Sequence, residues 1–392
     1  MFEIELTPAI ITLFSIIVIT ALYLLLGFRR YVASVSRRVN KDDSSPLPTE
    51  ADAYPSVSVI VYSEDDAENL ETLLPQILEQ DYEARFEVIV VNDGAVSSTK
   101  DVIAWLERQY PNLYMTFTPL ESRSLSRKKL AITLGIKAAR YEVVLLTVGN
   151  CRIESRDWLK SMARHFIYGK EVVIGYATPL IPEDVPNPWK RLHAFDSVRT
   201  AVQYLSWAIA GRPYRGNCYN LAYRRSVFFK NKGFQRSLHL KFGDDDLFVN
   251  EVANRTNTAV ELSTASIVEV LDPYPQTSHK NMKLRYDYTA KSLRTGARAF
   301  FASCSWAWWL LTASAVAISI IGWPSLIPLI AAVVIWLAVC LSLMFSWRKT
   351  SRALGSRSLL LTVPWFMTYE PVYNLYYRIK GHAKRGNNLS WN

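Results

Sequence analysis

Three adjacent aspartates, Asp244, Asp245 and Asp246, stand between Gly243 and Leu247. Neighbouring carboxylates repel one another, which can raise the pKa of one of them toward a range useful for proton transfer. An exposed acidic turn is the alternative interpretation of the same residues. The triplet is therefore a candidate acid–base group.

Polar residues also follow three expected strands at the point where each strand ends. These clusters are Ser63-Glu64-Asp65-Asp66, Asn92-Asp93-Gly94 and Thr147 to Cys151. Ligands of open α/β sheets bind outside the carboxyl ends of the strands, so the coincidence indicates one site at this edge. Asn-Asp-Gly alone is also an ordinary turn.

Strands and helices that position these clusters alternate between residues 56 and 148. Expected strands cover 56–63, 86–93, 113–119 and 141–148, and expected helices cover 67–80, 96–110 and 127–139. Such alternation predicts an α/β domain with a mostly parallel sheet covered on both faces.

The first apolar run, residues 8–28, is uncharged and long enough to span a hydrocarbon core of about 30 Å. Five basic residues follow between positions 29 and 41, whereas Glu3 and Glu5 precede the run. A cleaved signal peptide has the opposite polarity. We expect a retained anchor with Met1 outside and the rest of the chain in the cytoplasm.

Two further apolar runs, 299–323 and 325–346, predict a transmembrane hairpin around Trp323-Pro324, with Trp323 outside. The last apolar run, 359–377, contains two prolines and a glutamate and has basic residues on both sides. This pattern favours an interfacial or re-entrant segment over a simple span. Segments 189–211 and 280–300 suit helices lying on a membrane surface or ordinary surface helices of the domain.

The composition combines 50% hydrophobic residues with a net charge of +10. Basic residues crowd around apolar runs instead of forming a separate stripe, which favours membrane lipids as partners and argues against nucleic acid. The cysteines are Cys151, Cys218, Cys304 and Cys340. Their spacing predicts neither a zinc site nor a disulfide framework.

Four segments in this order resemble the family 2 glycosyltransferases, especially the membrane-bound types that include cellulose and hyaluronan synthases. They are VIVVNDGAVSSTKDVI, KKLAITLGIKAARYEVVLLTVGNC, RGNCYNLAYRRSVFFKNKGF and FGDDDLFVNEVA. The resemblance covers about residues 55–290 and implies a GT-A-like nucleotide-diphospho-sugar transferase domain.

The resemblance implies a donor site. Asp93 would accept hydrogen bonds from the nucleotide base, Asn92 replaces a usual aspartate, and Lys128 or Lys129 would lie near the diphosphate, with surface lysines as the alternative. Arg285 survives from the family's last motif and could hold the diphosphate bidentately. The full set expected to bind the nucleotide sugar is Ser63, Glu64, Asp93, Lys128, Lys129, Asn150 and Arg285.

The acidic triplet matches the motif that supplies the family's general base, which takes a proton from the acceptor hydroxyl during inverting transfer. By register Asp244 is the first choice and Asp245 the second, with Asp246 completing the catalytic set. Tyr286, where the family has tryptophan, and Asn220 are expected at the acceptor site.

The end of the fourth expected strand departs from the family. Two aspartates there hold a divalent metal, Mg²⁺ or Mn²⁺, whereas this chain reads Val148-Gly149-Asn150. Valine cannot ligate a metal and asparagine is a weak, neutral ligand. Metal dependence stays open, with Asn150 as a weak candidate and no other ligand assigned.

Taken together, these residues predict a membrane enzyme that transfers a sugar from a nucleoside diphosphate sugar to a lipid-linked or glycan acceptor at the cytoplasmic face of the cytoplasmic membrane. The eroded motifs keep an inactive relative, acting as a binding or accessory subunit, as the alternative. The expected divisions are an anchor (1–28), a basic segment and linker (29–55), the transferase domain (56–277), an interfacial helix (278–298), a transmembrane hairpin (299–346), and an interfacial segment with a basic tail (347–392).

Overall fold

The computed structural model describes residues 7–48, 54–94, 97–119, 126–322, 326–357 and 359–383. The chain divides into two compact units. Unit 1 comprises Met1–Ser36, Asn187–Ser206 and Arg294–Asn388, and unit 2 comprises Arg37–Pro186, Trp207–Leu293 and Leu389–Asn392.

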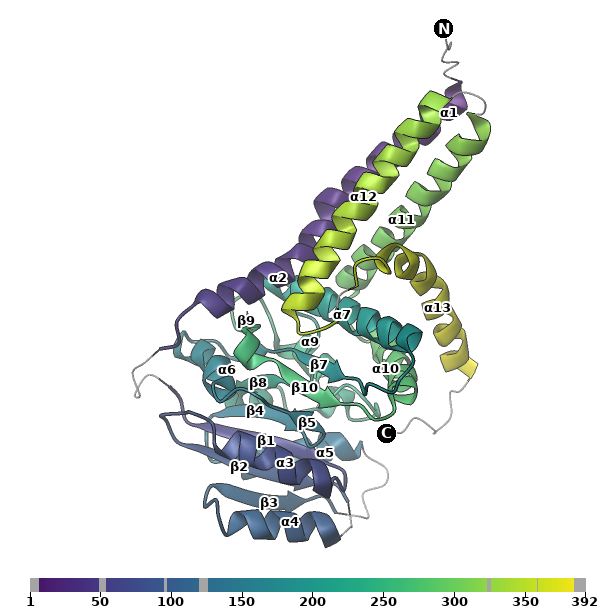
Figure 1. Cartoon of the computed structure of the whole chain (residues 1–392). Coiled ribbons are helices and arrows are strands. Elements are labelled where there is room, and N and C mark those ends of the chain that lie inside the picture. The colour runs from purple at the N-terminus through teal and green to yellow at the C-terminus, as the bar shows by residue number, and fades with distance from the viewer. Residues whose placement is uncertain are drawn as a thin grey trace. The chain divides into compact units, whose positions relative to one another are not determined.

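Within the described part of unit 2, seven strands form one sheet: β1 (Val57–Ser63), β2 (Phe86–Asn92), β3 (Leu113–Phe117), β4 (Val143–Val148), β6 (Val172–Ile174), β8 (Leu221–Arg224) and β9 (Thr258–Val260). Their order is β3-β2-β1-β4-β8-β6-β9, and Figure 1 labels each of these strands except β6. The first four are parallel neighbours, β8 is antiparallel to β4 and β6, and β9 is parallel to β6.

A smaller sheet in unit 2 has the order β5-β10-β7. Its strands are β5 (Cys151–Arg152), β7 (Ala177–Leu180) and β10 (Val268–Leu271). Strand β10 is antiparallel to β5 and parallel to β7.

The helices of unit 2 include α3 (Ala67–Leu78), α4 (Ser97–Glu107), α5 (Arg127–Ala138), α6 (Trp158–Ile167), α8 (Arg225–Lys230), α9 (Asp246–Val252) and α10 (Pro275–Ala290), with short 3₁₀ turns η3 (Gln235–Ser237) and η4 (Thr264–Ser266).

Helices cover both faces of the parallel part of the sheet. Successive side chains of a strand point to opposite faces, so two neighbouring residues of β1 show which helices lie on each face. Val59 of β1 packs in one buried cluster with Leu73 of α3 and Ile103 of α4. Ile60, the next residue, faces α5, where a Cβ on Gly135 would lie 2.7 Å from its Cγ2. The close approach of α5 to the sheet therefore requires glycine at that position.

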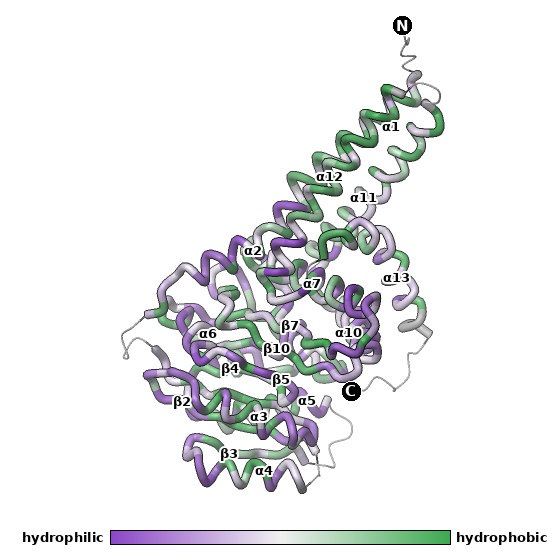
Figure 2. Tube along the Cα trace, in the orientation of Figure 1, coloured by the Kyte–Doolittle hydropathy of each residue, from purple (hydrophilic) through white to green (hydrophobic). Residues whose placement is uncertain are grey.

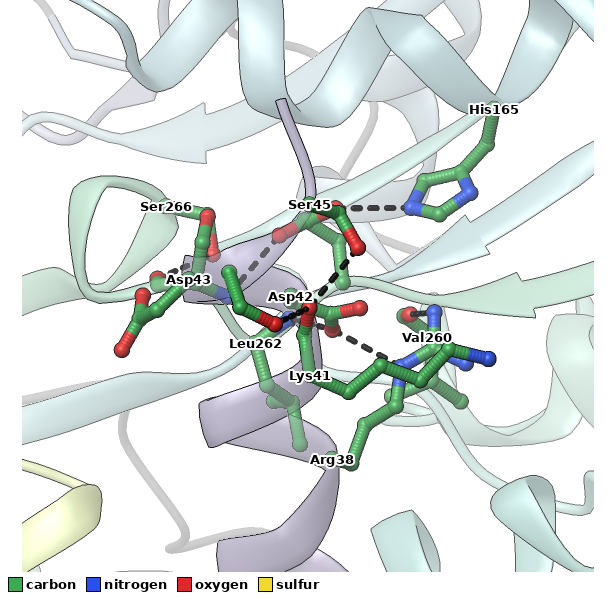
Figure 3. Close-up of polar contacts among 12 residues, drawn as sticks. Arg38, Lys41, Asp42, Asp43, Ser45, His165, Val260, Leu262 and Ser266 are labelled. Carbon is green, nitrogen blue, oxygen red and sulfur yellow. Dashed lines mark hydrogen bonds and ion pairs between the residues drawn. The ribbon is translucent and has the colours of Figure 1, made fainter. Parts of the chain in front are cut away.

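The end of α2 (Arg29–Ser44) is held in unit 2 by buried polar contacts (Figure 3). The Arg38 side chain donates to Asp42 at 2.8 Å and to the Val260 carbonyl at 2.6 Å. Asp42 also accepts from the Leu262 amide at 3.0 Å. Residues expected as a basic segment and the start of a linker are thus helical as far as Ser44, and residues 49–53 of that linker lie outside the described part.

The expected interfacial helix over residues 278–298 is wrong as a single element. Helix α10 ends at Ala290, and α11 (Thr295–Ile321) begins after a short turn. Arg294 has extended backbone, with φ −56° and ψ 132°, which interrupts the helical hydrogen bonding. Near the end of α10, the hydroxyl of Thr289 donates to Asp246.

Unit 1 consists of long helices: α1 (Pro8–Leu22), the π-helical turn η1 (Tyr23–Phe28), the first part of α2, most of α7 (Asn187–Ile209), α11, α12 (Leu326–Ala353) and α13 (Val363–Ala383). Figure 2 shows apolar residues along most of α1 and α12. Among the described residues, Pro8–Ser44, Thr295–Ile321 and Ile327–Ala353 are long and apolar enough to cross a membrane.

The prediction of an α/β domain with N-terminal and C-terminal transmembrane helices is therefore confirmed. Helix α13 is not among the spans found in the described residues. Its interfacial or re-entrant placement stays a prediction, as do the sides of the membrane. Met1, Trp323 and the tail after Ala383 lie outside the described residues.

Candidate active site

The carboxyl ends of β1, β2 and β4 meet at one edge of the sheet, as the strand-end clusters predicted. The Asp93 amide donates to the Ser63 carbonyl, and the Gly149 amide donates to the Tyr62 carbonyl, each at 2.7 Å. The Ser63 side chain is only 1% exposed, because it packs beneath Gly149. Ser63 therefore shapes this edge of the sheet. Its hydroxyl is enclosed, in contrast to the expectation that it binds the nucleotide sugar.

Asp93 is buried and its carboxylate is fully engaged. Tyr62 donates to one oxygen at 3.1 Å, Thr118 donates to the other, and Arg127 pairs with that second oxygen at 2.5 Å. Burial, together with Glu64 and Asp93, raises the pKa of Tyr62, so the phenol stays a donor. The sequence did not single out Arg127, although it directly precedes the two predicted lysines.

Asn92 is fully buried and organises the loop after β1. Its side-chain oxygen accepts from the Asp65 amide at 3.4 Å, and Asp65 has a positive φ of 50°. A Cβ on Gly94 would overlap the Asp65 carboxyl group, so the turn after β2 needs glycine to pack against this loop. The Asn-Asp-Gly segment is thus a turn and a part of the candidate site.

Lys128 is buried next to Asp244, the first residue of the acidic triplet. Its ammonium lies 3.4 Å from Asp244 and donates to the Cys218 sulfur at 2.9 Å, with the Tyr62 ring 5.4 Å away. Burial alone lowers the pKa of this ammonium, but the negative groups around it, Asp244 foremost, raise that pKa above its ordinary value. Lys128 is therefore a fixed cation beside the acidic triplet.

Lys129 has a different role from its neighbour. Its ammonium is fully buried and donates to the carbonyls of Ser237 and Leu240, at 2.5 and 2.9 Å. Burial lowers its pKa, while Asp244 opposes that shift. Lys129 therefore anchors the segment before the acidic motif, and the expectation of Lys129 at a diphosphate is not supported.

The three aspartates have separate environments. Asp244 is 1% exposed; burial raises its pKa and Lys128 opposes the shift. Asp245 is partly exposed, begins α9 by accepting from the next amide at 2.7 Å, and accepts from the Cys218 amide at 3.1 Å. Burial and the neighbouring Asp246 raise the pKa of Asp245.

Asp246, the last of the triplet, is structural. The carboxylate is buried, lies 3.5 Å from Arg215 and accepts from the Thr289 hydroxyl at 2.5 Å. It therefore ties α9 to α10 and to the segment before β8. Arg215 is the first residue of the segment RGNCYNLAYRRSVFFKNKGF, but the sequence did not identify Asp246 as its partner.

Helix α10 brings Arg285 and Tyr286 to the same part of unit 2. The Arg215 guanidinium lies 4.0 Å from the Tyr286 ring centroid, and the Arg285 guanidinium lies 5.4 Å from that of Phe242. Partial burial and a nearby carboxylate raise the pKa of Glu64, and the cations around it, Arg285 among them, oppose the shift. Glu64 and Arg285 thus contribute opposite charges to one site.

Asn220 does not belong to the acceptor surface. Its amide is 0% exposed, donates to the carbonyls of Tyr176 and Ser266 at 3.0 and 2.7 Å, and accepts from Trp158 at 3.2 Å. The side chain therefore fixes the junction between the sheets, and its expected contact with an acceptor is wrong.

The side chains at the end of β4 do not fit a divalent metal. The Val148 side chain has no ligating atom, and the side-chain amide nitrogen of Asn150 donates to the Leu271 carbonyl at 3.2 Å. The Asn150 oxygen is buried and accepts no hydrogen bond from the described residues. No cluster of three or more His, Cys, Asp or Glu in the described part of the chain could hold a metal.

A family model described as glycosyl transferase family 21 matches residues 12–385. A dolichyl-phosphate beta-glucosyltransferase from Trichomonas vaginalis is 30% identical over 117 residues, which are 27% of this chain and 34% of the relative. The chain thus spans about a third of the length of the curated relative that it matches.

The fold is similar to that of a solved mannosyltransferase, PcManGT from Pyrobaculum calidifontis in complex with GDP-Man and Mn²⁺. The TM-score is 0.56 at 16% identity, over 95% of this chain and 100% of that one. S. aureus TarS is also similar, with 17% identity, a TM-score of 0.40, and coverage of 84% and 90%. At 16% identity, the similarity to PcManGT shows the fold alone.

Proposed function

The chain belongs to glycosyl transferase family 21 and is a glycosyltransferase, and from this premise we propose that it transfers a sugar from a nucleoside diphosphate sugar to a lipid-linked acceptor, with inversion, at the cytoplasmic face of the membrane. A glycan acceptor is the alternative. Kinship with the family 2 synthases remains a hypothesis that rests on the motifs.

One observation carries the proposal: a buried cation, Lys128, lies beside a partly exposed carboxylate motif at the carboxyl end of a parallel sheet. Transfer from a diphosphate needs positive charge where the leaving group develops and a base where the acceptor attacks. Arg127 and Arg285 add two further cations to the same site. Arg127 and Arg285 are partly exposed and would contact the diphosphate, whereas the buried Lys128 would act on its charge without touching it.

We assign the general base to Asp245 in place of Asp244. A base must reach the acceptor hydroxyl, and Asp245 is the member of the triplet with exposed surface. Asp244 is enclosed beside Lys128, and Asp246 is occupied by Arg215 and Thr289. The raised pKa of Asp245 makes its carboxylate a better proton acceptor than a free aspartate.

Because the donor set at Val148 and Asn150 does not fit a metal, we derive no step through one. Preorganised cations act on the same developing charge as a metal ion does. Lys128 and Arg127 hold fixed positions through their pairs with Asp244 and Asp93. They supply this charge without a metal.

Two observations support a lipid acceptor. Three helices of the described residues are long and apolar enough to cross a bilayer. The Trichomonas vaginalis relative, which matches over a third of its length, is named as a dolichyl-phosphate glucosyltransferase. Basic residues after positions 28, 346 and 377 favour a cytoplasmic catalytic unit, since Lys and Arg stay on that side.

The test is donor hydrolysis and transfer by the purified full chain, with a panel of UDP-, GDP- and dTDP-sugars and a total lipid extract as acceptor. Asp245→Asn should abolish transfer, and Asp101→Asn, a change at an exposed aspartate of α4, is the matched control. Absence of both hydrolysis and transfer with every donor would refute the proposed function.

A further inference from the structure

The segment before β8, residues 214–218, packs directly against α9. The Cys218 amide donates to the Asp245 carboxylate at 3.1 Å. A Cβ on Gly216 would lie 2.7 Å from Cγ2 of Val249, a residue of α9. The backbone of the segment therefore approaches α9 so closely that this position requires glycine.

Arg215, the neighbour of Gly216 in this segment, contacts both α9 and α10. It is buried, with 6% of the residue exposed. The guanidinium lies 3.5 Å from Oδ2 of Asp246, the first residue of α9, and 4.0 Å from the ring centroid of Tyr286 on α10. The Thr289 hydroxyl of α10 donates to the same Asp246 oxygen at 2.5 Å. One cation therefore joins two helices through a carboxylate and an aromatic ring.

These two helices carry groups that the proposed transfer needs on the two sides of the reacting carbon. Asp245, the proposed base, caps α9, and Arg285, the residue before Tyr286, would contact the diphosphate. The base and the diphosphate contact must keep a fixed separation, because a misplacement of about 1 Å can cost about 10²-fold in rate. The contacts of Arg215 set that separation.

We propose that Arg215 is a positioning residue for the transfer. By holding α9 through Asp246 and α10 through Tyr286, it fixes the base relative to the diphosphate contact. It acts through these neighbours and touches neither the donor nor the acceptor. The inference rests on the proposed function, because the groups that Arg215 places are the ones that the transfer uses.

The charges around Asp245 give this arrangement a signature in the pH dependence of transfer. Burial raises the pKa of Asp245, Asp246 raises it further, and Lys128 lowers it. The positive charge of Arg215 interacts with both Asp246 and Asp245, so it opposes the effect of Asp246 on the base. Further groups that interact with Asp245 are Lys129 of α5, Asp244 beside it, Cys218 before β8 and Tyr286 of α10. The Arg215–Asp246 pair thus adjusts the pH at which the base loses its proton.

The experiment measures the pH–rate profile of transfer by the purified full chain and its variants. Arg215→Met removes the cation and should move the acidic limb about one pH unit higher, because the pKa of Asp245 rises. Asp246→Asn removes the negative charge and should move the limb lower, and the double variant should return near the native limb. Arg215→Lys keeps the charge and should keep the limb, while the loss of the planar guanidinium raises the donor KM. If Arg215→Met does not fold, a native donor KM in Arg215→Lys would overturn the proposal.

Arg224→Met is the matched control. The Arg224 guanidinium also lies over an aromatic ring, 5.6 Å from the centroid of Phe166, and it donates to the Phe166 carbonyl at 3.0 Å. Arg224 pairs with Val143, the first residue of β4, so it lies at the edge of the sheet opposite the candidate site. Its loss should leave the limb and the donor KM in place. An unmoved limb in Arg215→Met, or an equal shift in Arg224→Met, would contradict the proposal.

Hydrogen exchange of the α10 peptide tests the positioning without any substrate. Amides within Pro275–Ala290 should exchange at least about tenfold faster in Arg215→Met than in Arg224→Met, because α10 loses one of its contacts with α9. Equal exchange would overturn the proposed hold on α10. A native chain that is inactive with every donor would refute the proposed function, and the exchange result would still decide whether Arg215 holds α10.

Discussion

Replacing Lys128 with methionine should destabilise unit 2 strongly, because it leaves Asp244 buried without its counter-charge. The two charged atoms lie 3.4 Å apart, and the side chain of each residue is 2% exposed. With an effective dielectric constant of about 20, their attraction is about 5 kcal/mol. Removing one partner of a buried pair typically costs about 3–5 kcal/mol. For a unit of this size the melting temperature should fall by about 10 °C.

A double-mutant cycle separates the ion pair from other effects of the change. In Lys128→Met with Asp244→Leu, apolar side chains replace the whole pair, which is often neutral or stabilising. The double variant should therefore melt near the native chain and well above Lys128→Met, as measured by circular dichroism in detergent.

The control is the exposed pair Arg156–Glu79. Its atoms are 3.7 Å apart, but the side chains are 68% and 51% exposed, so Arg156→Met should cost less than about 1 kcal/mol. A native-like melting temperature for Lys128→Met, or losses that simply add in the double variant, would refute the buried-pair argument.

Asp245→Asn should lower the transfer rate by about 10²–10⁴ while donor affinity, measured by calorimetry, stays nearly unchanged; an unaffected rate would return the base to Asp244. The native rate should decline as pH falls through the raised pKa of Asp245, because the protonated carboxyl cannot accept a proton, and a pH–rate profile without that acidic limb in the native chain would contradict the assignment. Transfer should continue in excess chelator; activity that appears only in Val148→Asp with Asn150→Asp plus Mn²⁺ would contradict the metal-free proposal. A cysteine at position 380 should react with impermeant reagents only from the cytoplasmic side; labelling from outside would overturn the interfacial placement of α13.

The sequence alone predicted the parallel sheet and the membrane helices, because both depend on local patterns. Buried strands such as 57–63 are runs of β-branched residues, and a bilayer span such as 8–28 needs only length and the absence of charge. The meeting of the strand ends also followed from the sequence, since the carboxyl ends of adjacent parallel strands share one edge. Sequence periodicity did not reveal the break after Ala290, where Thr289 near the end of α10 donates to Asp246, a residue far away in the chain.

Tertiary structure decided which polar residues face a ligand and which face the protein. Lys128 and Lys129 are adjacent and chemically identical, yet one pairs with Asp244 and the other with two carbonyls, because successive helical residues point about 100° apart. Asn220 was expected at the acceptor and is instead enclosed between the sheets. Burial and partners come from residues far away in the chain, so residue type and spacing could nominate the acidic triplet, but only packing could distinguish its three carboxylates.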